Sequence, residues 1–422
     1  MVDVRWHAGL SAKNFGSNTF YSAKYDNQFE HTFKSYTAIQ AESRQGAFHL
    51  KPAIYWNHIY DRFELFRGEP GKYPFNYHRT DVWGLNLNAY FDWALGRTAF
   101  GAEVRNEDLV SGNLGEPLAN PKHIHGTGRM YDHGLNRTNI QLFLEHNIIL
   151  KRLTVSPGIT AVKNTQANMN MEVYPSIDAS YRIGDNWKIF ASYNTSLRMP
   201  SFTELYYSVG GHKADSHLLP EKLYAVEGGV HYLSNGVKAK ASVFYNHHKN
   251  LIDWINDGTL DDNGAALWKS VNFGEINALG ADAQVDFDFH SLLPAQRFLK
   301  SLSLSYSYLN QNEKEHEGII SQYSLEYLKN KFVAKTQFNV FRNLNLGINF
   351  RMQHRMGSYL DTANNRHTYG TYCLIDSRLS WDETIWNAFV EANNLLSRQY
   401  VDYGNVRQPG FWLIAGVAIN IR

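Results

Sequence analysis

Long segments of this sequence alternate between apolar and polar side chains with a period of two residues. In residues 300–310 the apolar or aromatic positions alternate with serines, namely Leu302, Leu304, Tyr306 and Tyr308 against Ser301, Ser303, Ser305 and Ser307. Since successive side chains of a strand point to opposite faces of its sheet, this segment predicts a strand with one apolar face and one wet face. A strand of about ten residues is long enough to cross the hydrocarbon layer of a membrane when it is tilted.

The same alternation recurs in four further segments. Their apolar sets are Leu85, Leu87, Ala89, Phe91 and Trp93; Ala281, Ala283, Val285, Phe287 and Phe289; Phe332, Ala334, Thr336, Phe338 and Val340; and Leu344, Leu346, Ile348, Phe350 and Met352. In the second segment the opposing face carries Asp282, Gln284, Asp286 and Asp288, which we predict to point inward. A soluble β-sandwich also alternates, but its strands average about five or six residues, so the whole set favours a membrane barrel.

Tight turns and long polar connections follow one another along the chain. The tight turns are predicted at Arg44-Gln45-Gly46, Gly96-Arg97, Leu150-Lys151, Gly184-Asp185-Asn186, Asn235-Gly236, the Pro294 region, Arg342-Asn343 and Asp382-Glu383. The long connections are predicted at residues 11–30, 68–78, 109–133, 199–219, 257–267, 311–328, 357–369 and 394–410. Outer-membrane barrels have short turns in the periplasm and long loops outside, so this asymmetry also predicts the orientation of the chain.

The predicted fold class is all-β, a transmembrane antiparallel β-barrel. The scheme gives about eighteen strands, beginning with Val2–Leu10 and ending with Phe411–Ile421. If the first strand runs outward, an eighteenth strand returns the chain to the periplasmic end. The parity of the strands therefore agrees with the predicted orientation.

Composition excludes several other classes. There is no run of about 18 apolar residues and the mean hydropathy is -0.43, which excludes a helical membrane protein. Aromatic residues make up 14% of the chain, which suits the aromatic girdles of a barrel. The net charge of +1 offers no broad basic field for nucleic acid, so none is expected as a partner. The single Cys373 excludes an intrachain disulfide or a cysteine metal cluster, and the first residues, MVDVRWHAGL, predict no signal peptide.

Two blocks of sequence carry a family resemblance. From Arg198 the chain reads Arg-Met-Pro-Ser-Phe-Thr-Glu-Leu-Tyr-Tyr, followed by Gly210-Gly211, Leu218-Leu219-Pro220-Glu221, Glu227 and Gly229. Near the end it has Asn393-Asn394-Leu395-Leu396, Tyr400, Asp402-Tyr403-Gly404 and Pro409-Gly410-Phe411-Trp412. In order and spacing these blocks resemble the barrel of TonB-dependent outer-membrane receptors. Asn14-Phe15-Gly16, Phe20-Tyr21-Ser22 and Tyr60-Asp61-Arg62 are similar to receptors of the cobalamin type.

The resemblance implies uptake of a scarce, bulky nutrient, such as a metal chelate or a cobamide, through a 22-stranded barrel closed by a plug domain. Its implied location is the outer membrane of a Gram-negative cell. Residues 1–422 are expected to be the C-terminal part of such a barrel, with no plug domain and about four strands fewer. The expected partners are outer-membrane lipid and an extracellular small-molecule nutrient, with the TonB system reached only through the plug domain and a surface lipoprotein as a further candidate. No cofactor is expected.

The candidate ligand-binding residues lie in the predicted external loops. Tyr206, Tyr207 and His212 follow the first family block and can line an aromatic vestibule, although interfacial tyrosines fit equally well. His123 and His125, with Met130 and His133 nearby, have a spacing that can hold a metal chelate, but a polar external loop explains them better and no metal site is predicted. An oxygen-rich loop contains Asp253, Asp257, Asp261, Asp262 and Asn263, yet it lacks the regular spacing of a calcium loop.

The chain has none of the common catalytic motifs, so it is predicted not to be an enzyme. A Gly-x-Ser-x-Gly elbow, a His-Glu-x-x-His helix and a glycine-rich phosphate loop are all missing from the sequence. Two other functions stay open at this point. A passive porin-type channel needs no plug domain, and a soluble all-β binding module would fold without lipid.

Overall fold

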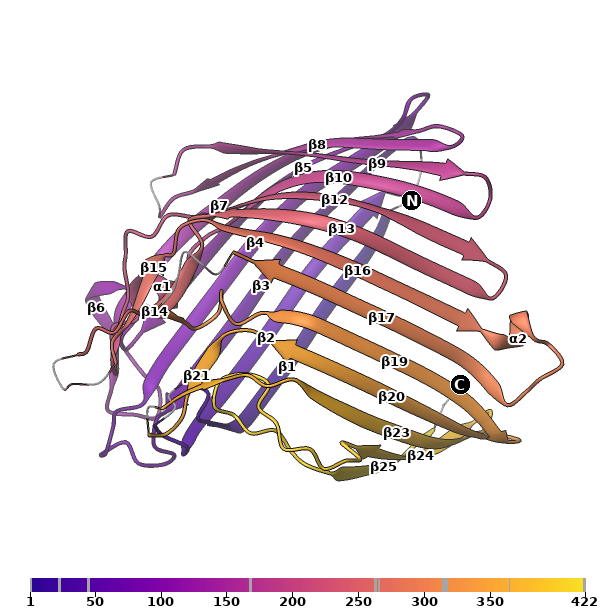
Figure 1. Cartoon of the computed structure of the whole chain (residues 1–422). Coiled ribbons are helices and arrows are strands. Elements are labelled where there is room, and N and C mark those ends of the chain that lie inside the picture. The colour runs from indigo at the N-terminus through magenta and orange to yellow at the C-terminus, as the bar shows by residue number, and fades with distance from the viewer. Residues whose placement is uncertain are drawn as a thin grey trace.

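The strands form one large antiparallel wall that curves around a lumen (Figure 1). The computed structural model describes residues 2–419 apart from 22–23, 44–45, 167–168, 262–263, 265, 313–317 and 364. The wall strands are β1 (Val2–Asn18), β2 (Gln28–Ser43), β3 (Phe48–Glu64), β4 (Asn76–Trp93), β5 (Gly96–Ser111), β7 (Met130–Ile149), β8 (Leu153–Asn164), β9 (Glu172–Ile183), β10 (Trp187–Arg198), β12 (Glu221–Ser234), β13 (Val237–Lys249), β16 (Ile276–Asp288), β17 (Leu299–Gln311), β19 (Leu328–Phe341), β20 (Leu344–Arg355), β23 (Tyr372–Asp382), β24 (Trp386–Asn393) and β25 (Trp412–Ile419). Each pairs antiparallel with its neighbours in this order.

The wall agrees with the predicted number of strands. The sheet has nineteen strands in the described residues, and one of them, β6 (Glu116–His123), is a short strand that pairs only with the loop end of β7, which leaves eighteen. In Figure 1 the short turns and both chain ends lie on the right, and the long connections lie on the left. The asymmetry of turns and loops is therefore confirmed.

The two faces of the wall also follow the alternating pattern. Asp286 pairs with Ser303 and with Lys238, so these three polar side chains share one face. The opposite face is apolar, and many of its side chains are exposed, such as Val243 at 58% and Leu279 at 51%. Because an exposed apolar band of this kind is stable only against hydrocarbon, the outer face suits a lipid bilayer. No helix among the described residues is long and apolar enough to span a membrane.

Several strands are longer than predicted. The first strand was expected at Val2–Leu10 with a loop at 11–30, but β1 continues to Asn18 and β2 begins at Gln28. Its polar residues stay in register with β2 as far as Gly16, because pairing satisfies the backbone beyond the apolar band and water solvates the side chains. In the same way the loop expected at 109–133 contains the end of β5, all of β6 and the start of β7.

The other long connections carry short elements of their own. They are α1 (Phe202–Tyr206), β11 (His212–Lys213), β14 (Ile252–Asn256), β15 (Trp268–Asn272), β18 (Ile320–Ser321), β21 (Ser358–Leu360) and β22 (Arg366–Thr368), while α2 (Phe289–Leu292) lies at the turn end. β11, β14, β15 and β18 form a separate small sheet at the loop end. Part of one predicted turn, Arg44-Gln45, and the predicted strand end Ile421 lie outside the described residues.

The wall is open along one line in the described part of the chain. There β1 pairs only with β2, and β25 pairs only with β24. The outward side chains of β1 are accordingly very exposed, with Trp6 at 70% and Leu10 at 78%. At the loop end, however, the two edges come together, because Thr19 Oγ1 donates to Asn405 O at 3.3 Å and the Phe20 ring lies 5.9 Å from the Tyr403 ring.

Candidate ligand-binding site at the loop end

A buried arginine fixes the segment after β10 to the barrel wall. The Arg137 side chain on β7 and Glu107 on β5 are largely buried and form an ion pair through Arg137 Nε. Arg137 Nη1 also donates to Pro200 O at 2.7 Å, and its guanidinium lies 4.3 Å from the centre of the Phe202 ring. The charge, the hydrogen bond and the ring contact together hold the start of α1 over the lumen.

The family block that begins at Arg198 forms a second connection. Arg198 donates to Glu204 at 3.0 Å and to Glu221 at 2.6 and 2.7 Å, so one guanidinium joins α1 to the start of β12. Ser201 and Glu204 form a capping box, in which each side chain accepts from the backbone of the other residue. Glu221 also accepts from Ile252 N at 2.7 Å, which extends the connection to β14. These residues therefore position the loop.

Two of the predicted ligand-binding residues belong to one series of aromatic ring contacts. The rings of Tyr207 and His212 meet edge to face at 5.5 Å, and those of His212 and Trp254 at 5.2 Å. Burial lowers the pKa of His212 and raises that of Tyr207, so both side chains are neutral near pH 7. Tyr206 points elsewhere, because it packs against the buried cluster of Leu205, Leu218 and Ile252 and its hydroxyl lies 3.5 Å from Glu116 Oε1.

The structure places His123 and His125 outside this series of ring contacts. Both are exposed at the end of β6, on either side of Ile124, which is only 1% exposed and belongs to a hydrophobic cluster with Phe75 and Tyr131. Across the described residues no three His, Cys, Asp or Glu side chains are grouped closely enough to hold a metal ion. The contact between Tyr206 and Glu116 is what brings the β6 loop against the α1 loop.

The acidic residues of the oxygen-rich loop are separated by their contacts. Asp253 is fully buried and accepts hydrogen bonds from Ser321 Oγ, from Tyr323 N at 3.1 Å and from Ser324 N at 2.9 Å. Asp257 is instead paired with Lys269 Nζ at 3.0 Å. Asp262 and Asn263 lie outside the described residues. Asp253 therefore caps the turn after β18, and both of its carboxylate oxygens are taken up by these hydrogen bonds.

A tyrosine cluster that the sequence reading missed joins three other loops. Tyr369 Oη donates to Glu326 Oε2 at 2.7 Å and accepts from Gly404 N at 2.9 Å. Tyr403 Oη donates to Gln322 O at 2.9 Å, and Arg355 Nη1 donates to Glu326 O at 2.7 Å. We name these four residues, Glu326, Arg355, Tyr369 and Tyr403, the tyrosine cluster. The sequence signals only one part of this cluster, Asp402-Tyr403-Gly404, which belongs to the second family block.

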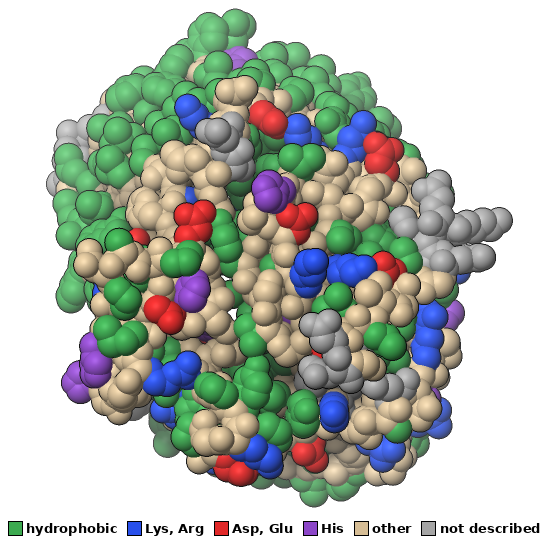
Figure 2. Space-filling view, turned by 90° about the vertical axis from the view of Figure 1, so that its left-hand side faces the viewer, with side chains coloured by type: hydrophobic (Ala, Val, Ile, Leu, Met, Phe, Trp, Pro, Cys, Tyr) green, Lys and Arg blue, Asp and Glu red, His purple; other side chains and the backbone are tan. Residues whose placement is uncertain are grey.

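The loop end presents a mixed surface to the outside. Figure 2 shows this face with Lys, Arg, Asp and Glu side chains scattered among apolar ones and a small opening between the loops. The guanidinium of Arg355 lies 5.9 Å from the Tyr369 ring and 6.0 Å from the Tyr403 ring. Tyr323 precedes Glu326 of this cluster by three residues in the sequence, and about half of its side chain is exposed. Aromatic rings with a few polar groups are typical of a site for an amphipathic or anionic ligand.

The tyrosine cluster should loosen as the pH rises. Burial, assisted by the charge of Asp253, raises the pKa of Glu326 from 4.5 to about 7, against the opposing effects of Tyr369 and Arg355. Between these values the folded protein binds more protons than the unfolded one, so the local stability is highest at acid pH and falls towards pH 7. Hydrogen exchange of residues 358–369 should therefore speed up from pH 5 to 8, after correction for intrinsic exchange.

The Glu326→Gln variant isolates that carboxyl, because an amide keeps the shape and does not titrate. Its exchange in residues 358–369 should not depend on pH in the same interval. Asp361→Asn is the matched control, since the hydrogen bond from His367 lowers the pKa of that carboxylate and it is ionised throughout. The wild-type pH dependence persisting in Glu326→Gln would contradict the assignment.

Comparison with known proteins agrees with the fold. The family model described as "TonB dependent receptor-like, beta-barrel" matches residues 3–395. Among solved structures, a mutant of the ferric enterobactin receptor PfeA from Pseudomonas aeruginosa is 14% identical with a TM-score of 0.74, covering 99% of this chain and 66% of the receptor. The siderophore receptor PirA from Pseudomonas aeruginosa is 14% identical with a TM-score of 0.71, covering 100% and 68%. The FrpB iron transporter from Neisseria meningitidis is 13% identical with a TM-score of 0.73, covering 99% and 70%.

At these identities the solved structures establish the fold alone, and this chain spans about two thirds of their length. The family model, however, matches nearly the whole chain, and the eighteen-strand wall with its long loops is the structure that such a model describes. The chain belongs to the TonB-dependent receptor family, whose β-barrel it forms.

Proposed function

We propose that this chain is the wall and loop end of an outer-membrane receptor that captures a scarce, bulky nutrient for TonB-energised uptake. The observation that carries the proposal is the tyrosine cluster, in which hydroxyl and guanidinium groups join three loops next to an exposed Tyr323. Loops held together in this way are preorganised, which reduces the entropy lost on binding a ligand. The plug domain and the contact with the TonB system would come from sequence other than these residues.

An iron chelate is the ligand class we favour within this proposal. The structural neighbours are named as ferric enterobactin and siderophore receptors and as an iron transporter, and two mutants of the enterobactin receptor were solved in complex with enterobactin. Arg355 beside two tyrosine rings supplies a positive charge and flat apolar surfaces, which suit an anionic aromatic chelate. A cobamide is the alternative ligand, as the resemblance to cobalamin-type receptors implied. We assign Tyr207 and His212 to the same vestibule, and His123 and His125 to its outer rim.

The ligand is tested by fluorescence titration of the purified chain in detergent. Ferric enterobactin should quench the intrinsic fluorescence saturably, while cobalamin, corrected for its absorbance, should not. Tyr323→Ala should weaken the binding of ferric enterobactin about 5- to 30-fold, because loss of one aromatic contact at a binding site costs about 1–2 kcal/mol. Tyr245→Ala is the matched control, since Tyr245 is similarly exposed, at 44%, but lies on the outer face of β13.

The two alternative functions make different predictions in the same preparation. A porin-type channel would conduct ions in a planar bilayer and would show no saturable binding of either chelate. A soluble binding module would be extracted as a folded monomer without detergent. Equal weakening in Tyr323→Ala and Tyr245→Ala would also count against the receptor site, because it would show that tyrosine loss affects the barrel in general. Lipid of the outer membrane and a surface lipoprotein stay as proposed partners.

A further inference from the structure

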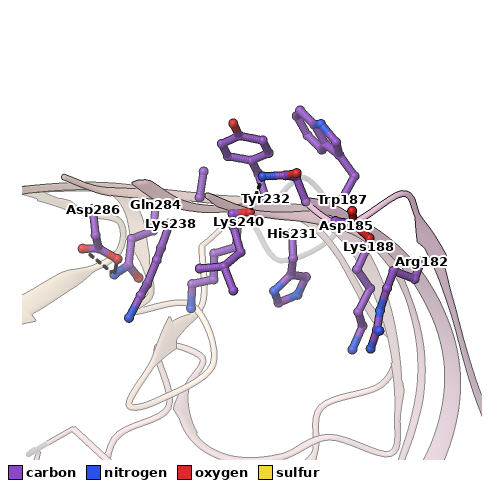
Figure 3. Close-up of a pocket in the computed structure, with 13 residues that line it drawn as sticks. Arg182, Asp185, Trp187, Lys188, His231, Tyr232, Lys238, Lys240, Gln284 and Asp286 are labelled. Atoms are coloured by element: carbon purple, nitrogen blue, oxygen red, sulfur yellow. Dashed lines mark hydrogen bonds between the residues drawn. The ribbon is translucent and has the colours of Figure 1, made fainter. Parts of the chain in front are cut away.

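The inner wall near the turn end carries a row of basic side chains. Arg182 on β9, Lys188 on β10, His231 on β12 and Lys240 on β13 are direct partners in the register of four adjacent strands. Figure 3 shows them on one side of the sheet together with Lys238, whereas Trp187 and Tyr232 point to the other side. We name these five residues, Arg182, Lys188, His231, Lys238 and Lys240, the basic row.

This arrangement has an electrostatic cost. Like charges directly opposite each other on neighbouring strands destabilise a sheet, and Arg182 lies opposite Lys188. Water in the lumen screens part of the repulsion, because all five side chains are exposed. An anion bound between the cations would offset the repulsion that remains.

The cations of the basic row have no carboxylate partner among the described residues. Asp286 is the cross-strand neighbour of Lys238, but Gln284 Nε2 donates to both of its carboxylate oxygens, at 2.9 and 3.2 Å. Several other wall arginines do have a carboxylate partner, as Arg97 has Asp92, Arg137 has Glu107 and Arg378 has Glu391. What distinguishes the basic row from isolated wall cations is that Arg182, Lys188, His231 and Lys240 are direct neighbours across adjacent strands.

The basic row lines a recess of about 540 Å³ on the inner wall. Its charged lining consists of four Lys or Arg side chains against Asp185 and Asp286, with the imidazole of His231 in the middle. This volume is within the range of sites for small molecules, roughly 300–1,000 Å³. Arginine and lysine on a flat wall recognise phosphate and carboxylate groups through charge-assisted hydrogen bonds.

We propose that the basic row is a binding site for a small multivalent oxyanion in the lumen of the barrel. The site is separate from the tyrosine cluster, because it lies at the turn end of the wall, and it does not depend on which nutrient the loops bind. Its position is suited to an anion that has entered the lumen or that approaches from the turn end.

The test is a calorimetric titration of the folded chain in detergent with inorganic pyrophosphate at low ionic strength. We expect one saturable site whose affinity falls as salt is added. In the double variant Lys188→Glu with Lys240→Glu the affinity should fall at least tenfold. The milder pair Lys188→Gln with Lys240→Gln should also weaken binding, and it keeps the test valid if the charge reversal prevents folding.

A double variant on the same wall provides the control. Lys331 and Lys335 on β19 face serines of β17, Ser307 and Ser303, and the described residues include no ion pair for either lysine. Lys331→Glu with Lys335→Glu changes the net charge by the same amount and should leave the affinity within twofold. Equal losses in the two glutamate double variants would overturn the proposal in favour of a general field in the lumen. Absence of saturable binding in the unchanged chain would also overturn it.

Discussion

Replacing Arg137 by alanine should release the segment after β10 from the barrel wall. The change leaves the buried Glu107 without its closest charge and removes both the hydrogen bond to Pro200 O and the contact with the Phe202 ring. Breaking a buried ion pair costs about 3–5 kcal/mol, and Arg105, which also pairs with Glu107, should keep the loss near 3 kcal/mol. Hydrogen exchange of residues 199–213 should speed up by roughly two orders of magnitude.

Two further variants separate the causes of that effect. Arg97→Ala removes an arginine whose pair with Asp92 is about half exposed, so it should leave exchange of every loop unchanged. Arg137→Lys keeps the positive charge but loses the flat guanidinium, and it should fall between the wild type and the alanine variant. If Arg137→Ala leaves the exchange of residues 199–213 unchanged, the buried pair does not hold the α1 loop.

The sequence predicts which side chains face the lumen because the alternation of side chains along a strand is a local rule. In a strand the direction of a side chain depends only on whether its position is odd or even, so Asp282, Asp286 and Ser303 could be assigned to the lumen from sequence. The ends of the strands were not predictable in this way. Polar residues such as those after Leu10 can continue a strand in water, and only their pairing with β2 shows that they do.

The loop end was largely beyond prediction, because its contacts join residues far apart in the chain. Asp253 is buried by a turn that begins 68 residues later, at Ser321, and no spacing within its own loop indicates this. The same applies to Tyr369 and Gly404, which are 35 residues apart. The sequence offers His212 as a candidate because it follows a family block, but its contact with Trp254 depends on how two loops pack.

The basic row could not be found from sequence either, although every member was visible. Lys188 and His231 are 43 positions apart, and their adjacency follows from the register of β10 and β12 alone. A shift of one residue in that register would send His231 to the outer face. Charge patterns on a barrel wall therefore have to be read across the strands.

Replacing Asp253 by alanine should separate the small sheet of the loop end from the turn after β18. The variant leaves the buried hydroxyl of Ser321 and two part-buried backbone N–H groups, of Tyr323 and Ser324, without their acceptor. A buried donor left unpaired costs about 1–3 kcal/mol, and the two part-buried groups cost less because water reaches them, so the local stability should fall by about 3 kcal/mol. Hydrogen exchange at residues 320–326 and 252–256 should then approach that of an open loop, while the wall strands keep their protection.

Asp253→Asn and Asp257→Ala make this prediction specific. The amide keeps one oxygen acceptor in place, so Asp253→Asn should lose less protection than Asp253→Ala. Asp257→Ala removes an exposed carboxylate from the same loop together with its pair to Lys269, and it should leave residues 320–326 as protected as in the wild type. Equal loss of protection in Asp253→Ala and Asp257→Ala would show that loop charge, and not the buried cap, joins the two segments. Because the tyrosine cluster includes Glu326 in the capped turn, Asp253→Ala should also weaken binding of ferric enterobactin in the proposed receptor.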